Sequence, residues 1–366
     1  MTGDAVAVFF CCVIVNLALH SGLQLLAEVS VSICFSQHMN QISSSILHHL
    51  RLSGGFLSGE DISVSLGITR SAVWKHIGAL RREGYRIDAV SGQGYRLFSL
   101  SGRPVHEEVS PWLTTRFIGR DLHYHELLES TNFSARVLAG TGTREGSVVV
   151  ADAQSGGRGR MMRSWVSPGG VNLYFSLILR PRVPGIRVPQ LTLLAAAAVH
   201  QALCSCVPEI ASRIKWPNDI MVGEKKLCGV LCEMQSEPDM THFVIIGIGI
   251  NVNIGEFPDE LRNIATSLFL ESGRMVSRPE LLASVLNHFE SLYEAWLLHD
   301  DLGFVLPYLH EYSLVYRRQV IIRQTTGDVC GTVSGIARGG ELMLDLDDAR
   351  TVLISSGDCL LCRQSP

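Results

Sequence analysis

The most constraining feature of this 366-residue sequence is the order of secondary-structure patterns between residues 42 and 98. The stretch "ISSSILHHLRL" predicts a helix, and a second helix is expected after Ser58, a residue suited to capping its start. In "ITRSAVWKHIGALRREG" the spacing of Val73, Ile77 and Leu80 predicts a third helix with one apolar face. Two β-rich runs around a glycine-rich turn, in "YRIDAVSGQGYRLF", then predict a hairpin.

Helix, turn, helix and hairpin follow one another in the order of a winged helix-turn-helix domain, whose second motif helix enters the major groove of DNA. The other face of that helix carries Arg70, Ser71, Trp74 and Lys75, and we predict that these residues contact DNA. Residues 51–96 include seven basic and four acidic residues, although the whole chain has a net charge of -4. A winged helix that packs only against protein is the alternative, because a fold does not fix a function.

Two further regions follow, so we expect an α+β multidomain protein. Residues 115–312 alternate between β-rich runs such as "VNLYFSLILR" and helical runs such as "RPELLASVLNHFESLYEAWL", which predicts a mixed α/β domain. Residues 314–366 read as short strands separated by glycine turns, and we expect a small SH3-like β-barrel there.

The first 38 residues differ from the rest. The apolar run from Ala5 to Leu19 is 15 residues long, shorter than the ~20 that a membrane span needs. A secretory signal would have a Lys or Arg before this run, and none is present there. We therefore expect residues 1–38 to be dispensable, with translation beginning at or near Met39, and no membrane association. A membrane anchor is the alternative.

The cysteines give no pattern of a disulfide scaffold or a metal site. Cys359 and Cys362 form a CxxC, and Cys204 and Cys206 a CxC, but neither has a matching second half. Reduced, mostly buried thiols in a cytoplasmic protein are the better interpretation, and no metal ligands are predicted.

Four motifs in the α/β region concentrate polar groups. "ESTN" (129–132) stands at a predicted strand-to-helix junction, and "SGGRGRMMRSW" (155–165) gathers three arginines on a glycine-rich backbone. "KWPND" (215–219) sets a lysine beside an aromatic-proline corner, and "IGIGINVN" (246–253) delivers an asparagine at the end of a strand. Glycines let a backbone approach a ligand closely, and arginine suits forked contacts with carboxylates and phosphates. Taken alone, the Gly/Arg stretch is equally well a solvated loop.

In this order behind a winged helix, the four motifs resemble those of biotin protein ligases of the bifunctional ligase and biotin-operon repressor type, from about residue 42 to the end. The resemblance implies ATP-dependent activation of biotin to biotinyl-5'-adenylate, with Mg²⁺, and transfer to a lysine of the biotin carboxyl carrier domain of acetyl-CoA carboxylase. It also implies a homodimer that represses biotin-synthesis genes at operator DNA, with the adenylate as corepressor. A biotin-sensing regulator without ligase activity and a lipoate-type ligase are the alternatives.

The resemblance also implies roles for individual residues. Arg158, Arg160 and Lys215 are expected to be catalytic, because they would neutralise charge where the biotin carboxylate meets the α-phosphate. Arg163 and Asn251 are expected to face the adenylate. The residues expected to bind biotin are Ser130, Thr131, Asn132, Gln154, Arg158, Gly159, Arg160 and Lys215.

Overall fold

The computed structural model describes residues 42–82, 84–99, 102–237, 240–325 and 327–362. The chain divides into two compact units, Met1–Ser101 and Gly102–Pro366, and each is described by itself. The prediction that residues 1–38 are dispensable concerns a segment outside the described residues.

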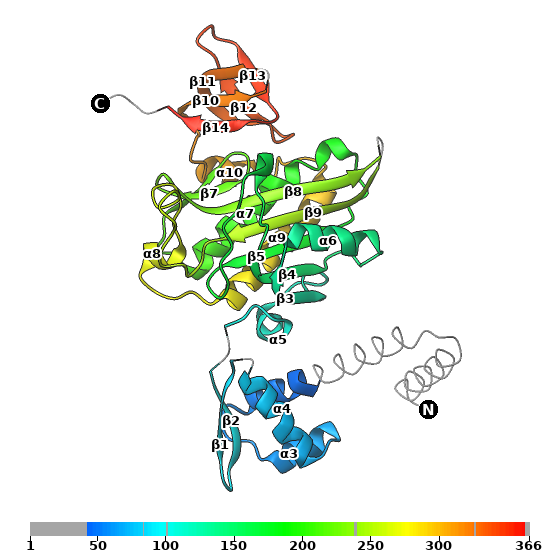
Figure 1. Cartoon of the computed structure of the whole chain (residues 1–366). Coiled ribbons are helices and arrows are strands. Elements are labelled where there is room, and N and C mark those ends of the chain that lie inside the picture. Colours follow the sequence, from blue (N-terminus) through cyan, green and yellow to red (C-terminus); the bar gives the residue numbers. More distant parts are fainter. Residues whose placement is uncertain (1–41, 83, 100–101, 238–239, 326, 363–366) are drawn as a thin grey trace, which may run out of the picture. The chain divides into compact units, whose positions relative to one another are not determined.

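The first unit has the predicted order of elements (Figure 1). Its elements are a helix over residues 42–53, α3 (Gly59–Leu66), α4 (Arg70–Arg82), β1 (Arg86–Val90) and β2 (Gly94–Ser99). The Ser58 hydroxyl accepts a hydrogen bond from the Asp61 backbone N–H, and Gly67 closes α3 in the left-handed region with φ 64°. The predicted winged helix-turn-helix is therefore confirmed.

This unit has its own core, so it does not depend on the rest of the chain for burial. The predicted apolar face of α4 is buried, and Tyr85 and Ile87 bring the hairpin onto it. His76, on the same helix, was not predicted to be buried; its Nδ1 lies 2.9 Å from the Ser43 hydroxyl.

The second unit is built on a seven-stranded mixed sheet in the order β3-β4-β5-β9-β8-β7-β6. The pair β3–β4 is parallel and every other neighbouring pair is antiparallel. The strands are β3 (Leu122–Leu128), β4 (Val148–Gln154), β5 (Leu173–Leu179), β6 (Ser212–Lys215), β7 (Asp219–Val222), β8 (Lys225–Ser236) and β9 (Thr241–Ile250). The predicted mixed α/β domain is thus confirmed.

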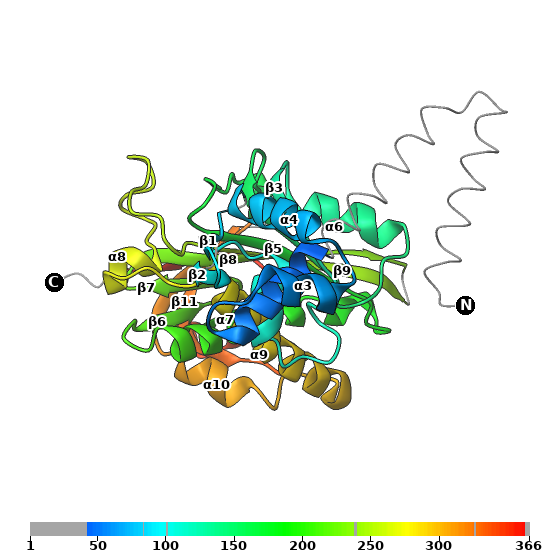
Figure 2. The ribbon, with the colours of Figure 1, turned by 90° about the horizontal axis from the view of Figure 1, so that it is seen from below.

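Alternate side chains of the central strands pack against helices on opposite faces of this sheet, because successive strand residues point to opposite sides. Val149 of β4 and Ile245 of β9 pack with α6 (Thr131–Gly140), whereas Val148 and Ile246 pack with α7 (Gln190–Cys206) and α9 (Arg278–His299). Figure 2 shows α7 and α9 together on one side of the sheet and α6 on the other. Both faces are buried, which explains the continuous apolar runs in the sequence.

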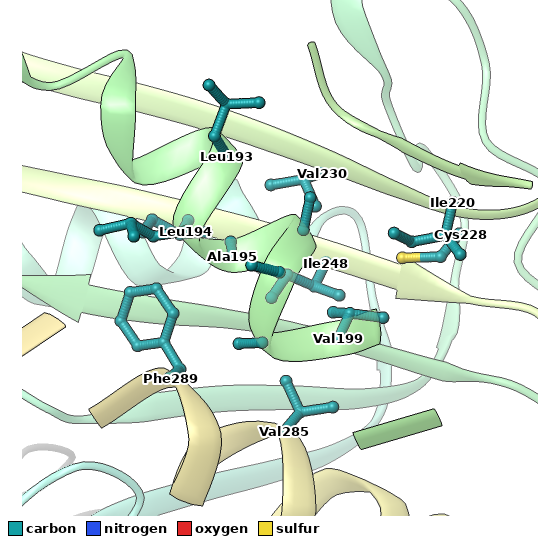
Figure 3. Close-up of a cluster of buried hydrophobic side chains, with 14 of the residues drawn as sticks. Leu193, Leu194, Ala195, Val199, Ile220, Cys228, Val230, Ile248, Val285 and Phe289 are labelled. Carbon is teal, nitrogen blue, oxygen red and sulfur yellow. The ribbon is translucent and has the colours of Figure 1, made fainter. Parts of the chain in front are cut away.

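Helix α7 lies at the centre of the main core. In Figure 3 its Leu194 and Val199 point toward Val285 and Phe289 of α9 and toward Ile248 of the sheet. Within the described residues, one helical stretch, Gly185–Cys206, is long and apolar enough to cross a membrane, but 72 % of its most apolar window is buried inside the protein.

The C-terminal strands form a five-stranded antiparallel sheet in the order β13-β12-β11-β10-β14. They are β10 (Gln319–Gln324), β11 (Gly327–Ile336), β12 (Leu342–Asp345), β13 (Thr351–Ile354) and β14 (Asp358–Leu361). A small C-terminal β-domain is confirmed, but in the described residues no ladder joins β13 to β14 to close a barrel. Its apolar residues, such as Val320 and Leu344, belong to the same core as α7 and the seven-stranded sheet.

Candidate ligand-binding pocket and nucleic-acid interface

One pocket of about 470 Å³ lies in the second unit and collects all four motifs. They reach it from the start of α6, the loop after β4, the β6–β7 turn and the end of β9. Every residue predicted to handle biotin or the adenylate lines this pocket: Ser130, Thr131, Asn132, Gln154, Arg158, Gly159, Arg160, Arg163, Lys215 and Asn251. Segments up to about 120 residues apart in sequence therefore converge, as the family resemblance implied.

The "ESTN" motif sits at the β3-to-α6 junction, as predicted. Ser130 takes the N-cap position of α6 but makes no side-chain capping bond, so its hydroxyl is not used by the helix. The Thr131 backbone N–H donates to the Gln154 side-chain oxygen at 2.9 Å, and the Gln154 amide in turn donates to Ser167 at 3.0 Å. Gln154 is thus fixed at the end of β4, with its two amide atoms assigned by their partners.

Asn132 lies across three adjacent strands. Its Oδ1 accepts from the Ser176 hydroxyl of β5 at 2.7 Å, and its Nδ2 donates to Glu233 of β8 at 2.7 Å. Between these strands, a Cβ added at Gly247 of β9 would stand only 2.0 Å from the Asn132 Oδ1. Only glycine therefore leaves room for the amide at this point.

The Gly/Arg stretch forms a tight hairpin at the pocket rather than an extended loop. The backbone N–H of Trp165 donates to the Gly157 carbonyl at 2.9 Å, and the backbone N–H of Gly159 donates to the Arg163 carbonyl at 2.7 Å. A Cβ at Gly157 would meet the Trp165 carbonyl oxygen at 2.6 Å, which explains a glycine there. The tip is formed by Met161 and by the residue after it, both with positive φ (54° and 60°), a conformation uncommon for methionine.

Five cationic and three carboxylate side chains line the pocket, an excess of two positive charges in a chain whose net charge is -4. Two of the carboxylates are closely paired: Asp358 accepts from Arg163, and Asp219 lies 2.6 Å from Lys226. The eight are Arg158, Arg160, Arg163, Lys215, Lys226, Asp219, Glu224 and Asp358.

The three cations predicted to be catalytic lack a close carboxylate. Arg158 reaches Glu129 only at 3.8 Å, with both side chains more than half exposed, and Arg160 donates to the Asn218 amide oxygen at 3.1 Å. Lys215 has no ion pair with any residue that the structure describes. The positive charge of the pocket that no close carboxylate balances is therefore concentrated on these three side chains.

Trp165 was not predicted from the sequence, yet it forms a wall of the pocket. Its ring lies on paired glycines of β8 and β9: a Cβ at Gly249 would be 2.7 Å from the indole, and one at Gly229 would be 3.2 Å away. The Lys226 ammonium is 5.4 Å from the ring centroid. The indole N–H is buried and has no hydrogen-bond partner among the described residues, which leaves a donor for a ligand.

Arg163 and Asn251, the two residues expected to face the adenylate, are also engaged within the protein. Arg163 pairs with Asp358 of β14, and the buried Asn251 amide donates to the Thr266 carbonyl at 3.0 Å. Arg160 contacts the same C-terminal strand region through the Gly357 carbonyl, at 3.5 Å. The C-terminal sheet therefore supplies part of the pocket, a contribution that no local motif indicated.

Metal-ligating clusters of three or more His, Cys, Asp or Glu residues are absent from the described residues. Cys359 is buried in β14, and burial raises the pKa of its thiol to about 11, although the nearby Lys215 ammonium opposes that rise. A thiol in this state is protonated at neutral pH and is a poor metal ligand or nucleophile.

The predicted DNA contacts all lie on the exposed face of α4. Trp74 is 70 % exposed, and Arg70, Ser71 and Lys75 are exposed as well. Arg70 makes one solvent-exposed ion pair, at 3.5 Å, with Glu60. Trp74 therefore stands beside two basic side chains on the exposed face of the helix that we predict to contact DNA.

Two family models match the chain. Residues 126–251 match the Biotin/lipoate A/B protein ligase family, and residues 43–96 match an HTH domain. The Bifunctional ligase/repressor BirA of Bacillus subtilis is 43 % identical over 295 residues, which cover 80 % of this chain and 90 % of that protein. BirA of Escherichia coli is 28 % identical over 81 % of this chain and 91 % of its own length. A structure of the biotin protein ligase from Aquifex aeolicus in complex with biotin and ATP superposes with a TM-score of 0.58 and 30 % identity, covering 67 % of this chain and all of that one.

Proposed function

Because this chain belongs to the family of bifunctional biotin ligases and repressors, we propose that its pocket holds biotin and ATP side by side and joins them. The protein is an ATP-dependent biotin–protein ligase and a DNA-binding repressor. The observation that carries our assignment of the site is the convergence, in one pocket, of three cations that lack a close carboxylate with fixed side-chain amides.

In the first step, a biotin carboxylate oxygen attacks the α-phosphorus of ATP, the bond to the β-phosphate breaks, and pyrophosphate leaves. Both reactants are anions, so the barrier contains a repulsion that fixed positive charge lowers. Arg158, Arg160 and Lys215 are the groups we assign to this task. No general base is needed, because the nucleophile is already ionised, and positioning contributes the rest.

In the second step, a neutral lysine ε-amine of the carrier domain attacks the acyl carbon, AMP leaves with the electron pair of the C–O bond, and the nitrogen releases one proton to solvent as the amide forms. We propose that the carrier is the biotin carboxyl carrier domain of acetyl-CoA carboxylase, since two relatives are named as ligases that act on acetyl-CoA carboxylase. The anhydride must survive until that lysine arrives, and the Gly/Arg hairpin is placed to shield it from water.

We assign the two ends of the pocket to the two substrates. The amides of Asn132 and Gln154, together with Ser130 and Thr131, suit the polar ureido ring of biotin. The flat face and free N–H of Trp165 suit a purine, since stacking of a base on an aromatic ring contributes ~1–3 kcal/mol. We expect Mg²⁺ to enter with the ATP phosphates, because it is usually held by phosphates and few protein groups.

A pyrophosphate-release assay tests the ligase assignment. We expect release that requires both biotin and ATP, and no release when lipoate replaces biotin. Equal release with lipoate would assign the pocket to the other branch of the matched family. Absence of release with either acid would leave a ligand-sensing regulator.

We further propose that the repressor works as a dimer on two half-sites, because one recognition helix makes few base contacts. The adenylate can favour the dimer only by binding it more tightly than the monomer. A gel shift on the promoter of the organism's biotin-synthesis genes, with and without biotin and ATP, is the test. Binding that is tightened by both substrates is expected, and binding unaffected by them would remove the adenylate from regulation.

A further inference from the structure

Glu233, a residue outside the pocket lining, is the nearest acceptor of the Asn132 amide nitrogen, and the Leu231 carbonyl also accepts from that nitrogen at a longer 3.4 Å. A side-chain amide has an oxygen that accepts and a nitrogen that donates, and the two look alike in shape. The Glu233 carboxylate only accepts, so it selects the nitrogen as its neighbour at 2.7 Å. The Asn132 oxygen thereby accepts from the Ser176 hydroxyl at 2.7 Å, and Asn132 itself lines the pocket.

Glu233 is itself held in place from the helix that carries Asn132. Arg136 lies one turn further along α6 and contacts the other Glu233 oxygen at 2.5 Å. Residues i and i+4 of a helix share one face, so Asn132 and Arg136 both donate hydrogen bonds to the Glu233 carboxylate from the same face of α6. Among the described residues each Glu233 oxygen thus has one donor, and turning the carboxylate out of this plane would break both contacts.

We propose that Glu233 is a positioning residue that aims the Asn132 oxygen at a ureido N–H of the bound acid, and so makes the pocket selective for a cyclic urea. This inference rests on the proposed biotin site. The Asn132 oxygen has two acceptor positions, and Ser176 occupies one of them. The remaining acceptor position of the Asn132 oxygen can only accept a hydrogen bond, so a ligand without a donor facing this oxygen binds poorly.

Glu233→Gln removes this control, because a glutamine side chain can either donate to or accept from Asn132. A flipped Asn132 would turn its N–H groups against the ureido N–H. We expect the KM for biotin to rise on the order of tenfold to a hundredfold, the range for a buried group left without its hydrogen-bond partner. The value of kcat at saturating biotin should fall far less than KM rises.

A reciprocal exchange separates positioning from simple support of the fold. Asn132→Asp alone places two carboxylates together and should weaken biotin binding strongly through repulsion. In the double variant Asn132→Asp/Glu233→Gln, the glutamine N–H donates to the aspartate, which again offers an acceptor to the ligand. We expect the double variant to bind biotin at least tenfold more tightly than Asn132→Asp, whereas a merely structural role predicts that thermal stability recovers and biotin binding does not.

Calorimetric titration of the full chain with biotin, and with its two analogues methylated on either ureido nitrogen, completes the test. The wild type should reject one methyl isomer strongly, and Glu233→Gln should discriminate less between that isomer and biotin. Glu237→Gln, an exposed glutamate beyond the end of the same strand, is the control and should behave as wild type.

The outcomes are distinguishable. Wild-type discrimination retained in Glu233→Gln, with an unchanged KM, overturns the positioning role and leaves the biotin site intact. A wild type that does not bind biotin removes the proposed function itself. If Glu233→Gln fails to fold, Arg136→Gln takes its place, since it frees the Glu233 carboxylate and should raise the KM in the same direction.

Discussion

The indole ring of Trp165 packs on the paired glycines Gly229 and Gly249, and this packing gives a quantitative prediction for Gly249→Ala. The added methyl would be 2.7 Å from the indole Cε2 and Nε1 atoms. Ordinary contact between such atoms begins at ~3.5 Å, so the ring has to retreat by roughly 0.8 Å (3.5 - 2.7). A hydrogen bond from its N–H to the Gly157 carbonyl fixes the Trp165 backbone. The indole ring can therefore move away from the added methyl only by entering the pocket.

A displacement of about 1 Å at a positioning group can reduce a rate ~10²-fold. We therefore expect kcat/KM for ATP to fall by about two orders of magnitude, or ~2.7 kcal/mol at 1.36 kcal/mol per factor of ten. Biotin binding without ATP should change little, because the ureido end is built around Asn132 and Gln154. The backbone φ of Gly249 is not in the left-handed region, so alanine should not strain the strand.

The assay is pyrophosphate release at varied ATP, with calorimetric biotin titration and thermal unfolding on the same samples. Gly255→Ala is the matched control, since its nearest atom would be 3.6 Å away, at Phe269. Gly247→Ala should show the opposite selectivity and weaken biotin binding through Asn132. An unchanged KM for ATP in a folded Gly249→Ala protein would refute the assignment of Trp165 to the nucleotide.

Three other predictions have defined outcomes. Arg160→Ala and Lys215→Ala should each lower biotinyl-adenylate synthesis by ~10²–10³-fold with the fold intact, and near-normal synthesis in both would refute the charge-neutralising role. Arg70→Ala or Lys75→Ala should weaken DNA binding in a gel shift and leave ligation as in the wild type; loss of ligation instead would contradict the separation of the two activities. A chain that starts at Met39 should be folded and fully active in the same assays, whereas loss of activity or membrane fractionation of the full chain in cells would overturn that expectation.

The sequence was most informative where function depends on local patterns. The start of α6, the Gly/Arg hairpin and the "KWPND" turn each lie in a single short segment, so each could be recognised as a motif, and the family resemblance carried by these motifs implied that they meet. The third helix was likewise predicted from the spacing of Val73, Ile77 and Leu80, all of which are buried.

What could not be predicted depends on contacts between distant segments. Asp358 lies 195 residues beyond Arg163, and nothing near it in the sequence indicates a pocket. Gly229 and Gly249 stand opposite each other beneath Trp165 because of the register of β8 and β9, which a single sequence does not specify. The positive φ of Met161 was equally hidden, because that conformation is expected of glycine or asparagine and not of methionine.

The shared core of the second unit decides which parts of this protein can be exchanged between relatives. The buried indole of Trp216, beside the Lys215 of the pocket, donates to the Gly340 carbonyl at 3.1 Å, and Val320 and Leu344 lie in the same core as α7. A chimera that imports only the C-terminal strands must therefore also import the surfaces on which they pack. The first unit has a core of its own, and a recombination joint near residue 101 would leave both cores whole, so new DNA specificities could be combined with an unaltered ligase.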